Sequence, residues 1–259
     1  MDFFISAFNI ILYQPLFNAL VFLYQFLPGK DFGIAVITLT IIIRIILYPL
    51  MIKSIKSQKM LSELQPKIQE IQQKYKNDKE KQAKEMMGFY QKEKINPFGG
   101  CLPLLIQLPI LIALYRVFWR GLQPGAISHL YSFVPNPGVI NPIFFGLINL
   151  AESNLGLAIF AGISQFFQSK MLMSKTTLQQ AGGGEVKKTD QKAQFSNIMQ
   201  KQMLYFFPIF TVLILLRLPS AIALYWIVTA LFSIFQQYLI IKPKSTSSFS
   251  SPSLPAETR

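Results

Sequence analysis

Arg44 stands alone in the middle of an apolar run, Phe32 to Ile52, that is long enough to cross a bilayer as a helix. Insertion scales give a cost of about 2.5–3.5 kcal/mol for an arginine at the centre of such a helix, so this residue is a candidate functional site. Every carboxylate of the chain lies in a loop, in a tail or at the end of an apolar run. None is placed to neutralise Arg44, and we expect water, backbone carbonyls or a substrate to do so.

The structural alternative for Arg44 is that its side chain snorkels to the cytoplasmic surface. Nine residues separate Arg44 from Lys53. At 1.5 Å per residue this places Arg44 roughly 13 Å below the cytoplasmic end of the span. A long side chain covers only part of that distance, so we favour a cation that stays at depth.

Other polar side chains fall within the apolar runs and could join Arg44. They are Thr40, Gln107, Gln165, Tyr225 and Trp226. If they converge, they form a groove that stays wet, because a guanidinium carries five donors and no acceptor and holds water strongly. Each also has a structural interpretation: Thr40 can bond to its own helix, Gln107 can bond to another helix, and the two aromatic residues can belong to an interfacial belt.

Catalytic constellations are missing from the sequence. The single histidine, His129, excludes paired-histidine metal sites, and the single cysteine, Cys101, excludes an intramolecular disulfide or a zinc cluster. No GxxxxGK[ST] loop for nucleotide phosphates occurs. We predict that the chain is not an enzyme and needs neither a cofactor nor a metal.

The composition is that of a polytopic membrane protein rather than a soluble basic one. Hydrophobic residues make up 51% of the 259 residues, while the formal charge is +13. The basic residues fill the gaps between apolar runs, which indicates a role in membrane topology and not in specific nucleic-acid binding. The first residues lack the features of a cleaved secretory signal.

Five apolar runs are long enough to predict an all-α fold with five transmembrane helices. They cover about 33–52, about 100–119, about 155–172, about 202–217 and about 219–241. The preceding segment, residues 1–29, is apolar but interrupted by polar residues, so we predict an amphipathic helix in the outer interface. A sixth spanning helix in this segment remains an alternative.

Lysine and arginine positions predict the orientation, because short cytoplasmic loops hold these residues in excess. They are abundant in residues 53–95 and 173–200, whereas Gly121 to Ser153 contains none. We therefore place the first two segments in the cytoplasm and the third outside, with the N-terminus outside and the C-terminus inside. The loop 173–200 is expected to be flexible, and the Ser/Pro-rich tail 242–259 is expected to be disordered.

Residues 53–95 are predicted to form a cytoplasmic hairpin of two antiparallel helices. Apolar residues recur there at helical spacing, in one stripe from Met60 to Tyr75 and a second formed by Ala83, Met86, Met87 and Tyr90. A bend is expected near Gln65, before Pro66. Because each narrow stripe can bury itself only against the other helix, we expect a mobile hairpin. The candidate substrate-recruiting residues are Met60, Leu64, Pro66, Met86, Met87 and Tyr90.

Several motifs together resemble the YidC/Oxa/Alb family of membrane protein insertases, nearly throughout the chain. They are Tyr13 to Phe17 (YQPLF), Thr40 to Leu50 (TIIIRIILYPL), Leu64 to Ile68 (LQPKI), Asn96 to Pro109 (NPFGGCLPLLIQLP) and Leu224 to Val228 (LYWIV) with Gln236-Gln237. The resemblance implies a five-helix core, a cytoplasmic hairpin and a hydrophilic groove sealed on the outer side. It makes Arg44 the groove arginine, Thr40 the groove threonine and Tyr225-Trp226 an aromatic pair on the last helix.

The resemblance also sets the expected location and partners. The chain is expected in the bacterial inner (cell) membrane as a multi-pass protein. Nascent membrane proteins and membrane lipids are the expected partners, with the Sec translocon and the ribosome as further candidates. Because a long basic C-terminal tail is missing, ribosome attachment through such a tail is not expected.

Our functional hypothesis is a membrane protein insertase and chaperone. The hairpin would receive an apolar segment, and Arg44 would hold the polar tail that must cross while the apolar segment passes into lipid. The alternative is a small-anion transporter or channel with Arg44 as its binding site, although the repeated halves usual in transporters are not visible. A purely structural assembly factor is a third possibility.

Overall fold

The computed structural model describes residues 2–94, 96, 102–121, 130–172 and 202–241. The predicted flexible loop 173–200 and the predicted disordered tail 242–259 lie outside these residues. The described chain is mostly helical, with one short two-stranded sheet.

The N-terminal helix runs without interruption through α1 (Asp2–Phe8), the π-helix η1 (Asn9–Tyr13) and α2 (Gln14–Phe26). It ends at Leu27, whose backbone is extended, just before Pro28. The inner face of α2 is buried against the core through Phe17, Leu20 and Val21. Residues Phe3–Phe26 are long and apolar enough to cross a membrane, so length and composition leave both the interfacial and the spanning interpretations open.

The first predicted span, 33–52, is not one straight helix. Instead, α3 (Phe32–Ile46) and α4 (Tyr48–Glu63) meet at Leu47 with a bend of 70°. Pro49 stands at the start of α4, where it lacks the N–H group needed to continue the hydrogen bonds of α3. Arg44 therefore lies in the last turn of α3 and not at mid-helix, and the depth of roughly 13 Å expected for a straight span does not apply.

The other predicted spans coincide with helices. They are α7 (Leu102–Gly121), α8 (Leu155–Leu172), η5 (Gln202–Phe206) continued by α11 (Phe207–Leu215), and α12 (Ser220–Ile241). By length and composition alone, two helices could cross a membrane, or three if the bent pair α3–α4 is one span, and shorter apolar helices accompany them. The described chain is therefore a mostly helical membrane protein, while the count of five spans remains a prediction.

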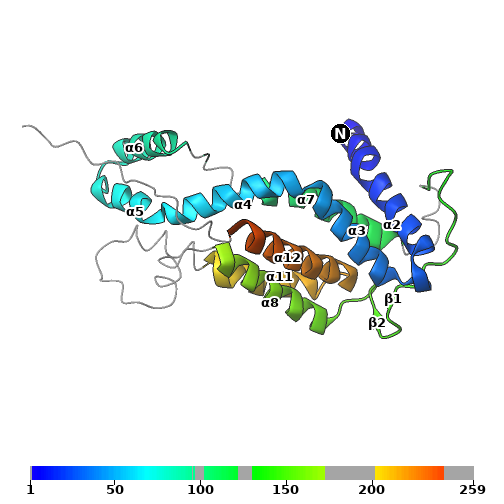
Figure 1. Ribbon diagram of the computed structural model, residues 1–259. Coiled ribbons are helices and arrows are strands. Elements are labelled where there is room, and N and C mark those ends of the chain that lie inside the picture. Colours follow the sequence, from blue (N-terminus) through cyan, green and yellow to red (C-terminus); the bar gives the residue numbers. More distant parts are fainter. Residues whose placement is uncertain (1, 95, 97–101, 122–129, 173–201, 242–259) are drawn as a thin grey trace, which may run out of the picture.

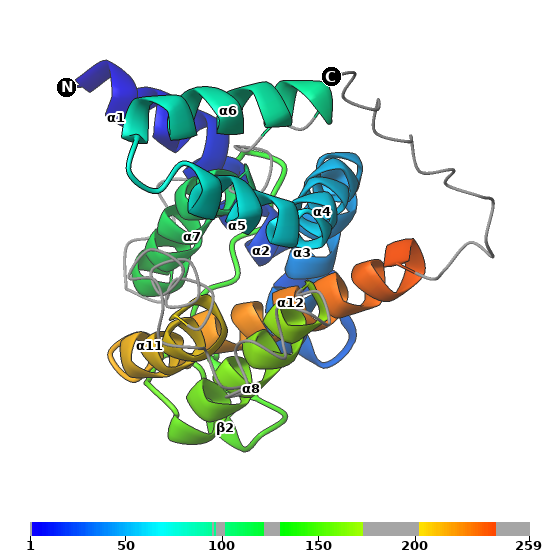
Figure 2. The same ribbon diagram turned by 90° about the vertical axis from the view of Figure 1, so that its left-hand side faces the viewer.

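The predicted hairpin is formed by α5 (Gln65–Lys74) and α6 (Lys79–Lys92), with the expected break before Gln65. The side-chain amide of Gln82 donates to the Gln72 carbonyl at 2.7 Å, and the Gln72 amide contacts the Met86 sulfur at 3.8 Å. Figure 1 shows the hairpin at one end of the molecule, beyond the helices of the core, and in Figure 2 this end faces the viewer, so that α5 and α6 lie in front of the core.

At the opposite end, β1 (Ile143–Phe144) and β2 (Ile148–Asn149) form an antiparallel pair. Asp31 ties this pair to α3: one carboxylate oxygen accepts from the Ile34 N–H at 3.0 Å and caps the helix, and the other accepts from the Phe145 N–H at 2.7 Å. Gly33 leaves the space that the Phe144 ring occupies, so the turn closes tightly over the start of α3.

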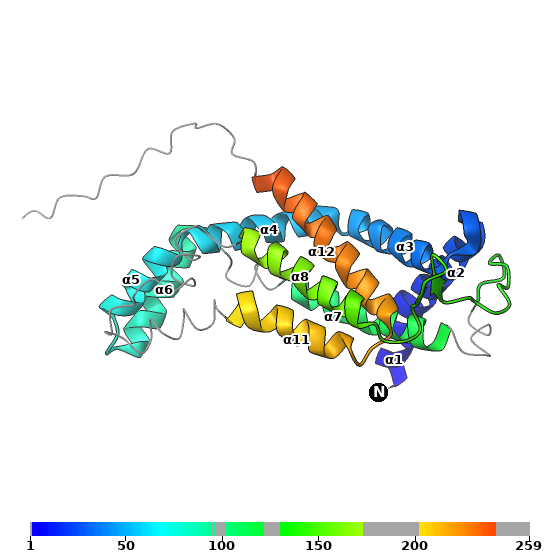
Figure 3. The ribbon, with the colours of Figure 1, turned by 90° about the horizontal axis from the view of Figure 1, so that it is seen from below.

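The core lies where α12 packs against α3 and α8, with α11 on the far side of α8. These helices and α7 run along the molecule in Figure 3, while the N-terminal helix passes across their end. Phe32 and Phe118 meet edge to face at 6.1 Å between ring centroids, and both are buried. α3, α7 and α12 all contribute buried residues to this core.

Candidate functional site: the polar cluster around Arg44

Arg44 is buried near the bend between α3 and α4, with 5% of its surface exposed. Its Nη2 atom donates to the Oε1 atom of Gln107 on α7 at 3.3 Å. The ion pair between Lys59 and Glu63 on α4, at 3.7 Å, does not involve Arg44. Within the part of the chain that the structure describes, the guanidinium is therefore held by a neutral amide, and no carboxylate compensates its positive charge.

Gln107 links Arg44 to the last helix. Its Nε2 atom donates to the hydroxyl oxygen of Tyr225 on α12. The Tyr225 side chain is almost fully buried. The amide is oriented by these two bonds, because its oxygen faces the cation and its NH2 group faces the phenol. Three helices far apart in the sequence thus meet in one polar cluster, Arg44–Gln107–Tyr225.

The guanidinium is buried but not sealed. The described residues include several fully enclosed polar side-chain atoms that lack a hydrogen-bond partner, and no atom of Arg44 is among them. Since Arg44 makes one bond through Nη2, the nitrogens without a bond retain accessible surface. Five donors with one partner leave an arginine that can bind water or an acidic group.

The remaining predicted groove residues divide into two cases. Thr40 is buried one turn before Arg44, but its hydroxyl donates to the Val36 carbonyl at 2.6 Å, which is the structural interpretation offered above. Trp226 donates from its indole N–H to Oε1 of Gln165 on α8 at 3.1 Å, forming a separate pair between α12 and α8. Neither aromatic residue fits a simple interfacial belt, since Tyr225 is buried and Trp226 is half-buried.

Further buried polar residues on α12 escaped the sequence analysis as site residues. They are Thr229, Ser233, Gln236 and Gln237. With Tyr225, the first three recur at intervals of four, four and three residues, which places them on one face of the helix. That spacing is visible in the sequence. Gln236 Nε2 and Gln237 Oε1 have no partner among the described residues, and such buried groups are commonly met by ordered water.

The hairpin residues are only partly packed. Met60 and Met87 are exposed, and Leu64, Pro66, Met86 and Tyr90 are half-buried. The expectation that Ala83 and Met87 bury themselves against the first helix is wrong, since both are exposed and α6 has no buried residue. The shorter α5 covers only the line of α6 that contains Gln82 and Met86. Burial raises the pKa of the Tyr90 hydroxyl above its ordinary value.

Comparison with known proteins shows which family the chain belongs to. Residues 22–247 match the family model described as 60Kd inner membrane protein. The chain is 36% identical over 212 residues to the membrane protein insertase YidC of Fusobacterium nucleatum, covering 82% of this chain and 87% of that protein. The corresponding protein of Oceanobacillus iheyensis is 36% identical over 219 residues, covering 83% of this chain and 76% of that protein.

The chain belongs to the YidC/Oxa family of membrane protein insertases. This membership decides between the hypotheses raised by the sequence in favour of a membrane protein insertase and against an anion transporter. Like other members it is a multi-pass membrane protein, and it is a non-enzymatic chaperone. Longer members exist: the relative from Geobacter sulfurreducens is 33% identical over 236 residues, which are 90% of this chain but 38% of that protein.

Proposed function

We propose that the cluster Arg44–Gln107–Tyr225 lines a hydrophilic groove through which the chain moves short polar tails of nascent membrane proteins across the bilayer. The observation that carries this proposal is the uncompensated Arg44 guanidinium, buried yet with accessible nitrogens. An acidic or polar tail can replace water at these donors without first breaking an ion pair. Thr40, Gln165 and Trp226 complete the groove wall in this proposal.

The energetics require no nucleotide. Carrying one charged residue to the centre of a bilayer costs about 2.5–3.5 kcal/mol, and a wet groove shortens the hydrocarbon path that imposes this cost. Moving one leucine-sized side chain out of water gains about 1.5–3 kcal/mol. Release of about two such side chains of the substrate into lipid therefore offsets the passage of one acidic residue.

The hairpin α5–α6 is assigned the reception of the incoming segment. The exposed Met87 on α6 supports this role, because methionine adapts its shape to varied apolar partners, and the exposed Met60 continues this surface onto the adjoining end of α4. The half-buried Leu64, Pro66, Met86 and Tyr90 would extend this surface. The break at Leu64 between α4 and α5 supplies a joint at which the hairpin can move relative to the core.

The proposed topology has five spans, with the N-terminus outside and the C-terminus in the cytoplasm of a bacterium. The N-terminal helix would lie in the outer interface, and its crossing of the core end opposite the hairpin supports this placement (Figure 3). The lysine-rich hairpin would then face the cytoplasm. Nascent chains and lipids are the proposed direct partners, and the Sec translocon and the ribosome remain predictions.

The first test replaces the proposed groove charge. Arg44→Ala is expected to block translocation of acidic tails, measured as protease protection in proteoliposomes, whereas Arg44→Lys keeps most of the activity because charge rather than bidentate geometry is required. A version of the same substrate with an uncharged tail is the control. Normal translocation of the acidic tail by the alanine variant would contradict the proposed role of the cation.

The second test maps the path of the substrate. A photo-reactive residue at Trp226 is expected to crosslink to a stalled, partly inserted chain. The matched control is Phe235 on the same helix, whose side chain is exposed and would face lipid. Equal crosslinking from both positions would argue against a groove on this side of α12.

A further inference from the structure

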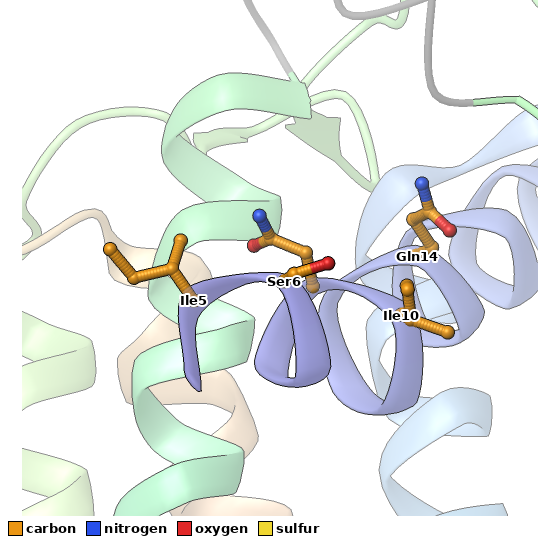
Figure 4. A pocket seen from close by; sticks show the side chains of 5 residues that line it. Ile5, Ser6, Ile10 and Gln14 are labelled. Carbon is orange, nitrogen blue, oxygen red and sulfur yellow. The ribbon is translucent and has the colours of Figure 1, made fainter. Parts of the chain in front are cut away.

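A hollow of about 430 Å3 on the N-terminal helix has no part in the insertion scheme. It is lined by Ile5, Ser6, Asn9, Ile10 and Gln14. Figure 4 shows the hollow from close by, with α7 passing behind the N-terminal helix. Three of the five lining side chains, those of Ser6, Asn9 and Gln14, are polar, and the hollow is a wide, open depression along one face of this helix.

The hollow coincides with the π-helix η1. Asn9 is the first residue of η1 and Gln14 follows its last residue. They are five residues apart, which is the hydrogen-bond interval of a π-helix, so the wide turn brings both amide side chains to the same side. Single π turns of this kind occur frequently at functional sites. The backbone irregularity thus has a local consequence, a pair of amides beside an open space.

Arg116 of α7 lies at the edge of the hollow. Its Nη1 atom donates to Oδ1 of Asn9 at 3.4 Å, and its guanidinium carbon lies 5.2 Å from the centroid of the Phe8 ring. The ion pair between Lys59 and Glu63 does not involve Arg116. Arg116 is half-buried and uses one of its five donors on a neutral amide. A second cation without a carboxylate partner among the described residues is therefore bonded to Asn9, one of the polar side chains that line the hollow.

The surroundings indicate what this cation would bind. Phe3, Phe4, Ile10 and Ile11 on the helix and Trp119 on α7 are all exposed. Such a rim suits acyl chains, and tryptophan favours the level of the lipid headgroups. A molecule with an anionic head and apolar tails matches both the charge and the rim.

We propose that Arg116, Asn9 and Gln14 bind the phosphodiester headgroup of a phospholipid of the outer leaflet, with the acyl chains against the apolar rim. The bound lipid would fasten the N-terminal helix to α7 at the membrane surface. This inference rests on the outer-face placement given under the proposed function, but not on the groove mechanism. A guanidinium pairs well with phosphate oxygens, and the two amides supply further donors.

Trp119 provides a reporter one turn from Arg116 on the same helix. The chain contains two tryptophans, so Trp226→Phe leaves Trp119 as the sole fluorophore. The full chain is reconstituted in phosphatidylcholine nanodiscs that contain either brominated phosphatidylglycerol or brominated diacylglycerol with the same acyl chains. Quenching of Trp119 gives the relative association of each lipid. We expect phosphatidylglycerol to be favoured about fivefold, the contribution of one basic residue near an anionic lipid.

Arg116→Gln should reduce this preference to about one, while Arg116→Lys keeps most of it. Lys30→Gln is the matched control, since it removes an exposed cation from the same end of the molecule. An equal loss with Lys30→Gln would mean that general surface charge causes the preference. Unfolding temperatures identify variants that fail to fold.

The protein that keeps Arg116 gives a test that does not depend on the folding of those variants. A preference of one in that protein would overturn the proposal, and so would full displacement of the lipid by soluble glycerol phosphate, which would assign the hollow to a free phosphate compound. Since insertion is not the readout, either result leaves the role of Arg44 intact. Conversely, failure of the Arg44 test would not change the lipid preference.

Discussion

The substitution Gln107→Glu tests whether the insertase needs a free positive charge or merely a polar residue at Arg44. Glutamate has nearly the shape of glutamine, and it can still contact both Arg44 and the Tyr225 hydroxyl, which would then donate. At the observed 3.3 Å, a carboxylate and a guanidinium attract each other by about 5 kcal/mol at an effective dielectric constant of about 20. This gross attraction exceeds the cost of inserting one charged residue, about 2.5–3.5 kcal/mol.

An acidic tail would therefore have to compete with a permanent internal carboxylate for Arg44. We expect translocation of an acidic tail to slow by at least about tenfold, which corresponds to about 1.4 kcal/mol of the lost attraction. Translocation of the same tail with its acidic residues changed to amides should be nearly unaffected. Protease protection over time in proteoliposomes measures both rates under identical conditions.

Gln165→Glu is the matched control for Gln107→Glu. It introduces the same carboxylate, but beside the indole N–H of Trp226 rather than beside Arg44. An equal slowing by both variants would show that added negative charge, and not neutralisation of Arg44, is responsible. Translocation of the acidic tail at the normal rate by Gln107→Glu would refute the requirement for a free cation.

Two further substitutions test the packing around the cluster. Tyr225→Phe removes the acceptor for the Nε2 atom of Gln107 and should destabilise the protein by about 1–3 kcal/mol. The measurement is the unfolding temperature in detergent, which should fall. An unchanged unfolding temperature would mean that this bond does not hold α7 to α12. Gly162→Ala places a Cβ atom 2.5 Å from a methyl group of Val212, so α8 and α11 must separate, at a cost of about 1–3 kcal/mol. The control is Gly88→Ala on α6, whose added Cβ atom meets no atom within 4 Å and should not destabilise the protein. Equal unfolding temperatures for the two variants would contradict the close approach of α8 and α11.

Helix positions followed from the sequence where turn signals bracket an apolar run. The predicted segments 155–172 and 219–241 coincide with α8 and α12 to within one residue, because Asn154 and Pro219 stand just before them. The bend at Leu47 was not predicted, since hydropathy stays high through the whole run and carries no information on helix direction. Pro49 was visible, but prolines are common enough in membrane helices that its presence alone does not locate a bend.

The pairing of the groove residues depended on information that the sequence does not hold. Gln107 could have bonded to any facing helix, and only the crossing of α3, α7 and α12 selects Arg44 and Tyr225 as its partners. One aspect was predictable: Tyr225 and Trp226 are adjacent, and adjacent residues point about 100° apart on a helix. They consequently face different neighbours, and they bond to different helices.

The buried polar row on α12 explains why Arg44 can remain charged without a carboxylate. The row consists of Tyr225, Thr229, Ser233 and Gln236 on one face, with Gln237 beside it. Enclosed polar atoms without a partner would each cost about 1–3 kcal/mol, so the row is stable only if water meets them. Arg44 is linked to this row through Gln107 and Tyr225, so we expect the same water to reach its nitrogens and to screen its charge without cancelling it. A carboxylate in place of Gln107 would remove the need for that water and with it the free cation that an acidic substrate tail requires.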